Sequence, residues 1–374
     1  MNDTPKTPSR GLLAWLEQRL NVTELFSFLS HFGLVYTPID TRRPLKDVLA
    51  EIDTTPVTSY ARWPHVLGVL AAILFALEAV TGLLLAYYYR PSPESAFEST
   101  RTIVRDLPAG GFLHQMHTWG AYLLIAVVAV RLIRLFWDGL YRAPRELLWF
   151  SAVSLMWLIL QLDFTGRLLT WNMKSYWAAE RGLEVMWSLP LVGPVLSFML
   201  GGRVMNEDVL IRFYVLHVAL LPLFYMIGLY ITFGTIRRVG LSAALEQTRG
   251  NVTTFRQHYI DLLIIALFLF AGMVTLATLA PFHFLGVADP YTTPAGARPP
   301  WYMLAPYAVF QRVPGPSWIP GGVMLAVALG LLLLPVWSRA GDSRFDEKRV
   351  RIAGAVAFGI WLALSVMGAF LDRR

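Results

Sequence analysis

The stretch GGFLHQMHTWGAYLLIAVVAVRLIRLFW, residues 110–137, decides the fold of this chain. Its only arginines, Arg131 and Arg134, come near its end. About 20 consecutive apolar residues are enough for a helix to cross a bilayer core of roughly 30 Å. A second stretch of the same kind, RFYVLHVALLPLFYMIGLYITFGTIRR, occupies residues 212–238. Both stretches therefore predict membrane-spanning helices.

The composition of the whole chain is typical of a protein that crosses a membrane several times. Of its 374 residues, 56% are hydrophobic and 15% are charged, and the mean hydropathy is +0.51. Pro190 and Pro194 interrupt the apolar region 184–201, which favours short surface helices there. We predict seven spans, at about 66–89, 113–137, 147–165, 213–235, 259–281, 318–337 and 352–371.

Lysine and arginine are unevenly distributed between the two sides that these spans define. With the N-terminus in the cytoplasm, the cytoplasmic segments hold 18 of them and the opposite side holds 12. This is the orientation that positive charge favours, and it accounts for the net charge of +7 without nucleic-acid binding. Neither a signal peptide nor a clear transit peptide opens the chain, so we expect a bacterial inner membrane.

The absence of cysteine limits the cofactors that the chain can hold. Disulfides, cysteine-ligated iron–sulfur clusters and thioether-bound haem are all excluded. Any cofactor must be held by histidine, methionine or carboxylate side chains.

The segment order predicts an all-α membrane protein, in which a four-helix haem-binding transmembrane bundle is followed by three further transmembrane helices. Residues 1–64 form a cytoplasmic N-terminal region with an amphipathic helix suited to the membrane interface. The bundle covers 65–236, and a cytoplasmic linker covers 237–258. The last three helices lie in 259–374, with a proline-rich extracytoplasmic loop at 282–317.

His117 and His217 support a haem site because both lie about one turn into their predicted spans, on the same side of the membrane. Ionisable residues inside a bilayer usually face the bundle interior or a partner. A lone membrane histidine often only bonds a neighbouring helix. A neutral imidazole can also ligate haem iron, and one from each helix would fill both axial positions. The matched depth favours one haem b with His117 and His217 as iron ligands.

Two glycines at the same predicted depth as His117 and His217 also support a haem site. Gly82 and Gly166 lack a Cβ, which lets a flat porphyrin approach the backbone, although close helix packing is an alternative reason for each. Fourteen residues toward the cytoplasm, about 21 Å along a helix, a second layer holds Gly68, Ala152, Arg131 and, fifteen residues after His217, Thr232. Neither Arg nor Thr normally ligates haem iron. The sequence therefore predicts one haem site and a vacated second one.

Several motifs carry a family resemblance that runs from residue 15 to the end of the last span. Together they resemble cytochrome b of the bc and b6f-type quinol:electron-acceptor oxidoreductases, in particular a fusion of the four-helix b6 subunit with the three-helix subunit IV. The motifs are WLEQRL at 15–20, EAVTG at 78–82, YYYRP at 87–91, PRELLW at 144–149, FTGRLLTWNMKSYWA at 164–178, RFYVLH at 212–217, ADPYTTP at 288–294 and PPWY at 299–302.

The resemblance implies two b haems held by four histidines, one haem near each membrane face. His117 and His217 match the pair for the extracytoplasmic haem, whereas the other pair is missing. Three histidines near the cytoplasmic ends could substitute in principle, but none lies at bundle depth: His31, His65 and His258.

The resemblance also implies a quinol-oxidising pocket closed by the loop after the fifth span. In the family, the PEWY motif of that loop carries a glutamate that accepts a proton from quinol. In this chain the motif reads Pro299, Pro300, Trp301, Tyr302, without the carboxylate. Since bifurcated quinol oxidation needs a proton acceptor and a second haem, the sequence argues against a classical Q cycle.

Three further residues are candidates for the cofactor site. Glu78 stands where the family usually has Gln, and it either relays protons, bonds a haem propionate or is a neutral packing residue. His114 replaces a usual Arg and is expected to meet a propionate. Arg134 is retained three residues after Arg131. These two arginines could bind lipid phosphate, quinone oxygens or a neighbouring subunit's carboxylate.

These observations leave three functions open. The preferred one is a membrane electron-transfer subunit of a quinol:electron-acceptor oxidoreductase complex, which passes electrons between quinone and a c-type cytochrome or Rieske protein. The second is a redox-poor cytochrome b paralogue that acts as a structural anchor in a respiratory or photosynthetic complex. The third is an ion or proton path through the vacated layer. Members of the family dimerise, which leaves a homodimer open for this chain.

Overall fold

The structure, a computed structural model, describes residues 56–58, 66–190, 192–202, 204–239, 252–283, 286–292, 298–338 and 347–371. The N-terminal region expected at 1–64 lies almost wholly outside these residues, and so does much of the expected linker at 237–258. His31, His65 and the side chain of His258 also lie outside the described part of the chain.

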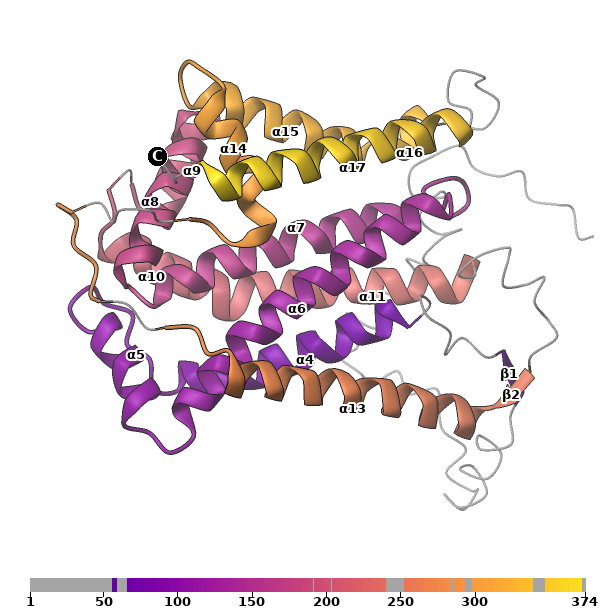
Figure 1. Cartoon of the computed structure of the whole chain (residues 1–374), viewed down its shortest axis with the longest axis horizontal. Coiled ribbons are helices and arrows are strands. Elements are labelled where there is room, and N and C mark those ends of the chain that lie inside the picture. Colours follow the sequence, from indigo (N-terminus) through magenta and orange to yellow (C-terminus); the bar gives the residue numbers. More distant parts are fainter. Residues whose placement is uncertain are drawn as a thin grey trace, which may run out of the picture.

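Long helices run side by side through the centre of the molecule (Figure 1). The core between them is apolar. Leu74, Leu124, Leu155 and Tyr225 are buried there and belong to one hydrophobic cluster. The elements that form this bundle are α4 (Leu67–Ala86), α6 (Gly110–Trp137), α7 (Glu146–Leu169) and a last helix made of α10 (Glu207–Val215), η1 (Leu216–Leu220) and α11 (Leu221–Val239).

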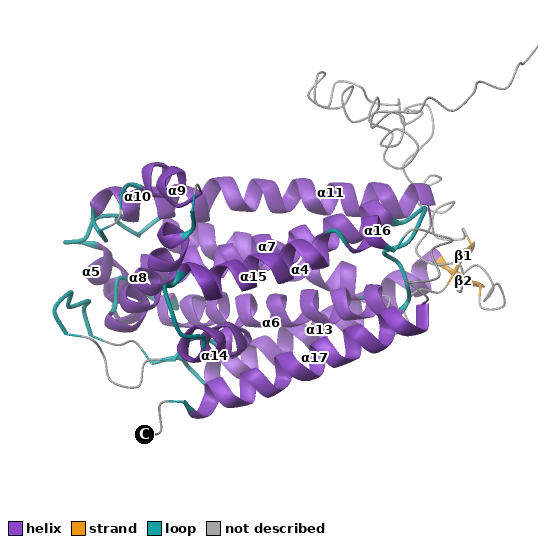
Figure 2. Cartoon of the chain, turned by 90° about the horizontal axis from the view of Figure 1, so that it is seen from above, coloured by secondary structure: helices purple, strands orange, loops and turns teal. Residues whose placement is uncertain are grey.

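The two ends of the bundle differ. One end, called here the short-helix end, carries α5 (Ala96–Arg105), α8 (Met173–Ser188), α9 (Val192–Leu200) and α10 (Figures 1 and 2). The other, called the strand end, carries the short antiparallel strands β1 (Pro56–Thr58) and β2 (Val252–Thr254). The region 184–201, where short helices are predicted, holds α9 and the last residues of α8, which ends at Ser188, two residues before Pro190.

The C-terminal helices flank the bundle on different sides (Figure 1). Helix α13 (Phe255–Leu279) lies along α6, and α17 (Glu347–Phe370) packs on α14 (Leu304–Arg312). The remaining elements are η2 (Trp301–Met303), α15 (Trp318–Leu332) and α16 (Leu334–Trp337). The described residues therefore confirm an almost entirely helical fold, with a four-helix bundle followed by further apolar helices.

Among the residues that the structure describes, six helices are long and apolar enough to span a membrane: Leu67–Ala86, Gly110–Trp137, Glu146–Leu169, Glu207–Ile236, Ile260–Leu279 and Glu347–Phe370. The seventh predicted span, 318–337, differs because α15 ends at Leu332 and α16 begins at Leu334. Pro335 has no N–H to donate to the Leu331 carbonyl. That carbonyl accepts a hydrogen bond from Trp149 Nε1 on α7 instead, at 2.8 Å.

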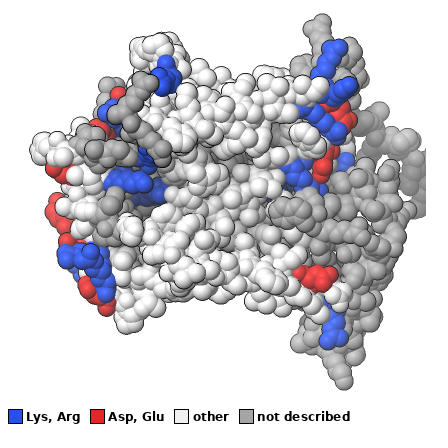
Figure 3. All heavy atoms as spheres, in the orientation of Figure 1, with Lys and Arg blue, Asp and Glu red and all other residues white. Residues whose placement is uncertain are grey.

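Charge and apolar surface are separated along the bundle axis. In the space-filling view, Lys, Arg, Asp and Glu gather at the two ends, and the broad band between them is almost free of them (Figure 3). Large apolar side chains on α4, α13 and α15, such as Leu83, Phe268 and Val327, are more than half exposed. Such a belt matches the hydrocarbon core of a bilayer.

Candidate cofactor site

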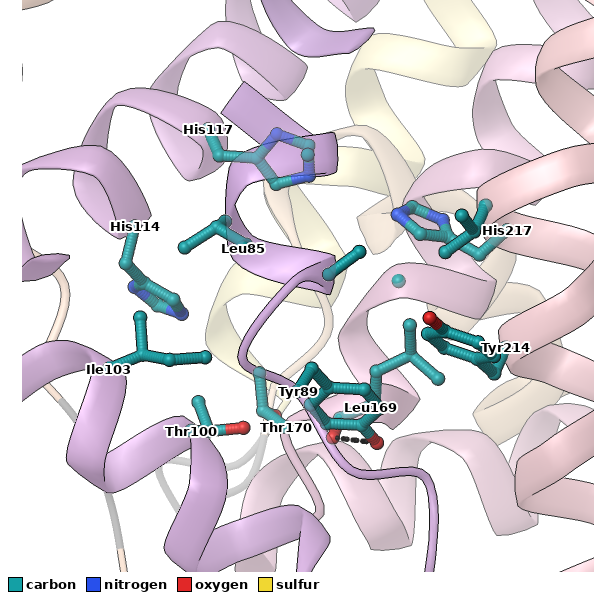
Figure 4. Close-up of a pocket in the computed structure, with 14 residues that line it drawn as sticks. Leu85, Tyr89, Thr100, Ile103, His114, His117, Leu169, Thr170, Tyr214 and His217 are labelled. Atoms are coloured by element: carbon teal, nitrogen blue, oxygen red, sulfur yellow. Dashed lines mark hydrogen bonds between the residues drawn. The ribbon is translucent and has the colours of Figure 1, made fainter. Parts of the chain in front are cut away.

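A cavity lies between the bundle helices at the short-helix end (Figure 4). The cavity has a volume of about 90 Å³, it is partly open to solvent, and most of its lining is apolar. The structure brings together five of the predicted site residues in its lining: Gly82, His114, His117, Gly166 and His217.

The two predicted ligand histidines face each other across this cavity from α6 and η1 (Figure 4). Their ring centroids are 6.2 Å apart, and the ring planes are nearly perpendicular, at 89°. A metal ion between two imidazoles needs a bond of about 2 Å to each nitrogen, plus about 1 Å from that nitrogen to the ring centre, or about 6 Å in total. The observed separation therefore suits one metal centre held by both rings.

The Nδ1 atom of each histidine has partners on the neighbouring helix. His117 Nδ1 lies 3.0 Å from Thr81 Oγ1 and 3.1 Å from a carboxylate oxygen of Glu78. His217 Nδ1 lies 3.0 Å from the Leu162 carbonyl and 3.3 Å from Thr165 Oγ1. Metal-binding histidines typically donate one ring N–H to such groups, which fixes the tautomer and leaves the other nitrogen for the metal. Nε2 is thus the nitrogen available on both rings.

The threonines and glycines of the site come as adjacent pairs, Thr81–Gly82 on α4 and Thr165–Gly166 on α7. Each threonine hydroxyl donates to the carbonyl four residues earlier, at 2.8 Å, so its oxygen can accept from the imidazole. A Cβ on Gly82 would lie 3.1 Å from His117 Cε1, and one on Gly166 would lie 2.5 Å from His217 Cε1. The glycines therefore make room for the histidine rings, a reason that the sequence analysis did not consider.

The helix around His217 is locally widened. Residues Leu216–Leu220 form a single turn of π-helix, in which the Leu221 N–H bonds to the Leu216 carbonyl. Pro222, which has no N–H, follows directly. Such π-turns occur often at functional sites, and this one carries a predicted metal ligand.

Polar groups also line the outer part of the cavity. His114 lies there, at the edge of the cavity beside Ile103 of α5 (Figure 4). Tyr89 donates its hydroxyl to the Leu169 carbonyl at 2.8 Å and stacks on Tyr214 at 5.6 Å between ring centroids. Burial and the neighbouring Tyr214 raise the pKa of Tyr89, so its hydroxyl keeps the proton that it donates.

The second layer, near the strand end, is filled by side chains. Arg131 is 6% exposed, and Thr232 donates a hydrogen bond to Ser151 Oγ at 2.9 Å. Between this layer and the cavity, Tyr225 stacks on Phe75 with 4.4 Å between ring centroids. Ala152, which lies fourteen residues before Gly166, is buried at 1% exposure.

Arg134, another predicted site residue, does not reach the cavity of His117 and His217. Its Nε lies 3.0 Å from Asp138 at the end of α6, and its side chain is buried. Glu78 is not in the cavity lining either, but it touches His117 directly.

The PPWY segment lies against α7 through a contact that the sequence analysis missed. The Tyr302 hydroxyl donates to Asp163, a residue 139 positions earlier in the chain. Asp163 forms a bidentate ion pair with Arg167, at 2.6 and 2.9 Å. The Arg167 guanidinium lies over the Tyr122 ring, 4.9 Å from its centroid. Burial and the Asp163 carboxylate raise the pKa of Tyr302, which keeps it a neutral donor.

The loop after α13 closes on α6 in the same region. The Gln115 amide bonds to both backbone groups of Phe282, at 2.9 Å to the carbonyl and 2.8 Å from the N–H. The Phe282 ring stacks on Tyr122 with 5.2 Å between centroids. An aromatic and ionic cluster therefore fills the space beside PPWY, and its members are Trp119, Tyr122, Asp163, Arg167, Phe282 and Tyr302.

The fold and the site define a class of protein: a helical membrane bundle with paired imidazoles that face each other across a cavity between its helices. The family model for Cytochrome b/b6/petB matches residues 52–240, and that for Cytochrome b(C-terminal)/b6/petD matches residues 287–371. The chain belongs to the cytochrome b family.

Individual relatives agree with this assignment. The chain is 41% identical to cytochrome b6 of Heliomicrobium gestii over 47% of its own length and 83% of that protein. It is 30% identical to the cytochrome bc complex cytochrome b subunit of Chlorobaculum thiosulfatiphilum, over 79% of its length and 69% of that protein. A chain of a hyperthermophilic respiratory Complex III shares the fold, with a TM-score of 0.71 and 24% identity over 96% of this chain and 91% of that one.

Membership of this family implies haem b as cofactor, and the residues of the cavity fit such a group. The facing rings lie at the separation that one metal centre needs. A Cβ at Gly82 or Gly166 would crowd these rings. The chain has no cysteine for thioether attachment, so the haem would be held without a covalent bond to the porphyrin.

Proposed function

We propose that this chain is an electron-transfer subunit of a cytochrome bc-like complex that holds one haem b between His117 and His217. It passes single electrons between the quinone pool and a partner redox protein, without the classical Q cycle. The observation that carries the proposal is the pair of facing imidazoles, 6.2 Å apart, each with Nδ1 fixed by the neighbouring helix.

The chemistry of the site follows from how these side chains are held. Haem b supplies a one-electron iron couple when it is bound. His117 and His217 would hold the haem iron through their Nε2 atoms, and with both imidazoles bound the site would carry single electrons and would not bind oxygen. The hydrogen bonds at Nδ1 keep both rings in one tautomer, and they limit rearrangement when an electron arrives or leaves.

A single haem is supported by the packing of the second layer. The Arg131 side chain, the Thr232–Ser151 hydrogen bond and the buried Ala152 occupy the positions where the family's other ligands and glycine stand. An arginine is always protonated in proteins and has no acceptor lone pair to offer iron.

The absence of a Q cycle is supported by the contacts of the PPWY segment. Asp163 places a carboxylate beside Tyr302, but its two oxygens are already engaged by Arg167 and Tyr302. The carboxylate that the motif lacks is thus replaced by one that is fixed in an ion pair.

Relatives are subunits of cytochrome bc complexes, so partners in a membrane redox complex are expected. We propose a c-type cytochrome or a Rieske protein as the direct partner, and a bacterial inner membrane as the location. With the N-terminus in the cytoplasm, the short-helix end and its haem face the extracytoplasmic side.

A pyridine haemochrome assay on the purified protein tests the proposal. We expect one protohaem per chain, and its loss in both His117→Ala and His217→Ala. His283→Ala, which removes an exposed histidine at the same end, is the matched control and should keep the haem. Two haems per chain would contradict the reading of the second layer, and none would favour the structural-anchor function.

A further inference from the structure

A buried cation in the second layer has no counter-charge among the described residues. Arg131 on α6 is 6% exposed. None of the residues that the structure describes accepts a hydrogen bond from its guanidinium or forms an ion pair with it. A charge inside a membrane bundle is costly, and it is normally paired with an opposite charge or with polar groups. Arg131 therefore needs a partner that no described side chain supplies.

Two further donors near Arg131 also lack a hydrogen-bond partner in the part of the chain that the structure describes. They are the buried hydroxyl of Tyr225 on α11 and the Nη2 atom of Arg134. Arg131 is close enough to both residues to interact with them electrostatically. A Cβ at Gly68 of α4 would lie 3.5 Å from Arg131 Nε, so the guanidinium packs against that helix. Donors from α6 and α11 therefore gather in one buried region beside α4.

The charges of this region do not balance. Asp138, at the end of α6, is engaged by Arg134, whose Nε lies 3.0 Å from one carboxylate oxygen. This ion pair leaves the positive charge of Arg131 uncompensated within the described structure. Arginine stays protonated in proteins, so the charge cannot be removed by loss of a proton. The compensating group must therefore bring a negative charge of its own.

We propose that Arg131, flanked by the unpaired donors of Arg134 and Tyr225, binds a small inorganic anion such as chloride. Guanidinium N–H groups and a phenol hydroxyl can all donate to an anion that carries no proton. A neutral quinone oxygen would bring no charge. A lipid phosphate lies at the membrane surface, whereas Arg131 and Tyr225 are 6% and 0% exposed. The site goes beyond the proposed function, because it does not require haem between His117 and His217.

Thermal unfolding of the purified full-length chain in detergent tests the site. Raising chloride from about 1 mM to about 100 mM, with gluconate keeping the ionic strength constant, should raise the unfolding temperature by about 2 °C or more, because the anion binds only the folded state. Arg131→Gln keeps a polar side chain and removes the charge, so it should abolish this response. Arg142→Gln is the matched control. Arg142 already pairs with Glu347 at 3.3 Å, and its loss should leave the response unchanged.

Crystals of the wild type grown in bromide give a second readout that does not depend on how a variant folds. Anomalous density beside the Arg131 guanidinium supports the proposal, and its absence overturns it. A wild type that does not respond to chloride, or a response that survives in Arg131→Gln, also overturns it. Stabilisation by phosphatidylglycerol in place of chloride would do the same and would assign Arg131 to a lipid phosphate. None of these readouts involves haem, so their failure leaves the proposed function untouched.

Discussion

Gly166 leaves less room beside its histidine than Gly82 does. The built Cβ contacts are 2.5 Å at Gly166 and 3.1 Å at Gly82, both to the Cε1 atom of a ring. We expect Gly166→Ala to push the His217 ring out of place and to lower haem affinity by about tenfold or more, and Gly82→Ala to lower it less.

The haem-to-protein ratio, measured by pyridine haemochrome after purification at limiting haem, checks this order. Gly272→Ala is the control, because a Cβ there meets nothing within 4 Å. Equal haem content in Gly166→Ala and wild type would show that the rings have more freedom than the structure gives them.

At the same scale, the sequence identifies some site residues and misses others for clear reasons. The matched depth of His117 and His217 indicates a shared site, and both residues line one cavity in the structure. Thr81 and Thr165 were missed because hydroxyl groups in membrane helices usually bond their own backbone, as these also do. The contact of Asp163 with Tyr302 could not be predicted because the two residues are 139 positions apart, and the sequence around neither of them indicates the other.

Among the elements, α7 and η2 are joined by the Asp163 contacts. Asp163 is 6% exposed and holds both Arg167 on its own helix and Tyr302 from η2. Removing one partner of a buried ion pair leaves an uncompensated charge. We expect Asp163→Asn to lower the free energy of unfolding by about 3 kcal/mol, and Tyr302→Phe by about 1 kcal/mol.

Unfolding of the purified protein in mixed micelles measures both effects, and the double variant gives the coupling between them. Coupling is expected because the Tyr302 hydroxyl donates to the same carboxylate that Asp163→Asn removes. Glu184→Gln breaks the exposed Arg181–Glu184 pair and should cost less than about 1 kcal/mol. Strictly additive losses in the double variant would mean that Tyr302 does not depend on Asp163.

Hydropathy alone predicts that a span exists, but it does not predict where a helix is interrupted. Six predicted spans are helices of sufficient length because an uninterrupted apolar run leaves the backbone no partner but itself. The run at 318–337 is equally apolar, yet it breaks after Leu332. Pro335 frees the Leu331 carbonyl, and Trp149 on a distant helix accommodates that group. A sequence window that covers one span contains no information about such a partner.

For the whole molecule, the one cavity that holds the paired histidines lies toward the short-helix end of the described structure. Electrons that enter there should stay on that side. We expect that reduction of the haem in reconstituted vesicles produces no membrane potential. A voltage-sensitive dye measures this, with valinomycin and a potassium gradient as the positive control. A dye signal that disappears in His117→Ala would show that charge does cross the membrane through this chain.

The filled second layer has a further consequence. The fourteen residues from His117 to Arg131 span about 21 Å, and leucine, isoleucine, valine and stacked rings occupy that distance as an insulating slab. Its far face carries the fixed cation of Arg131. At an effective dielectric constant of 20, such a charge lowers the energy of an electron at the opposite face by only about 0.8 kcal/mol. Under the proposed function, an electron on the haem would therefore be attracted only weakly toward Arg131, and the apolar layer would separate it from the strand end.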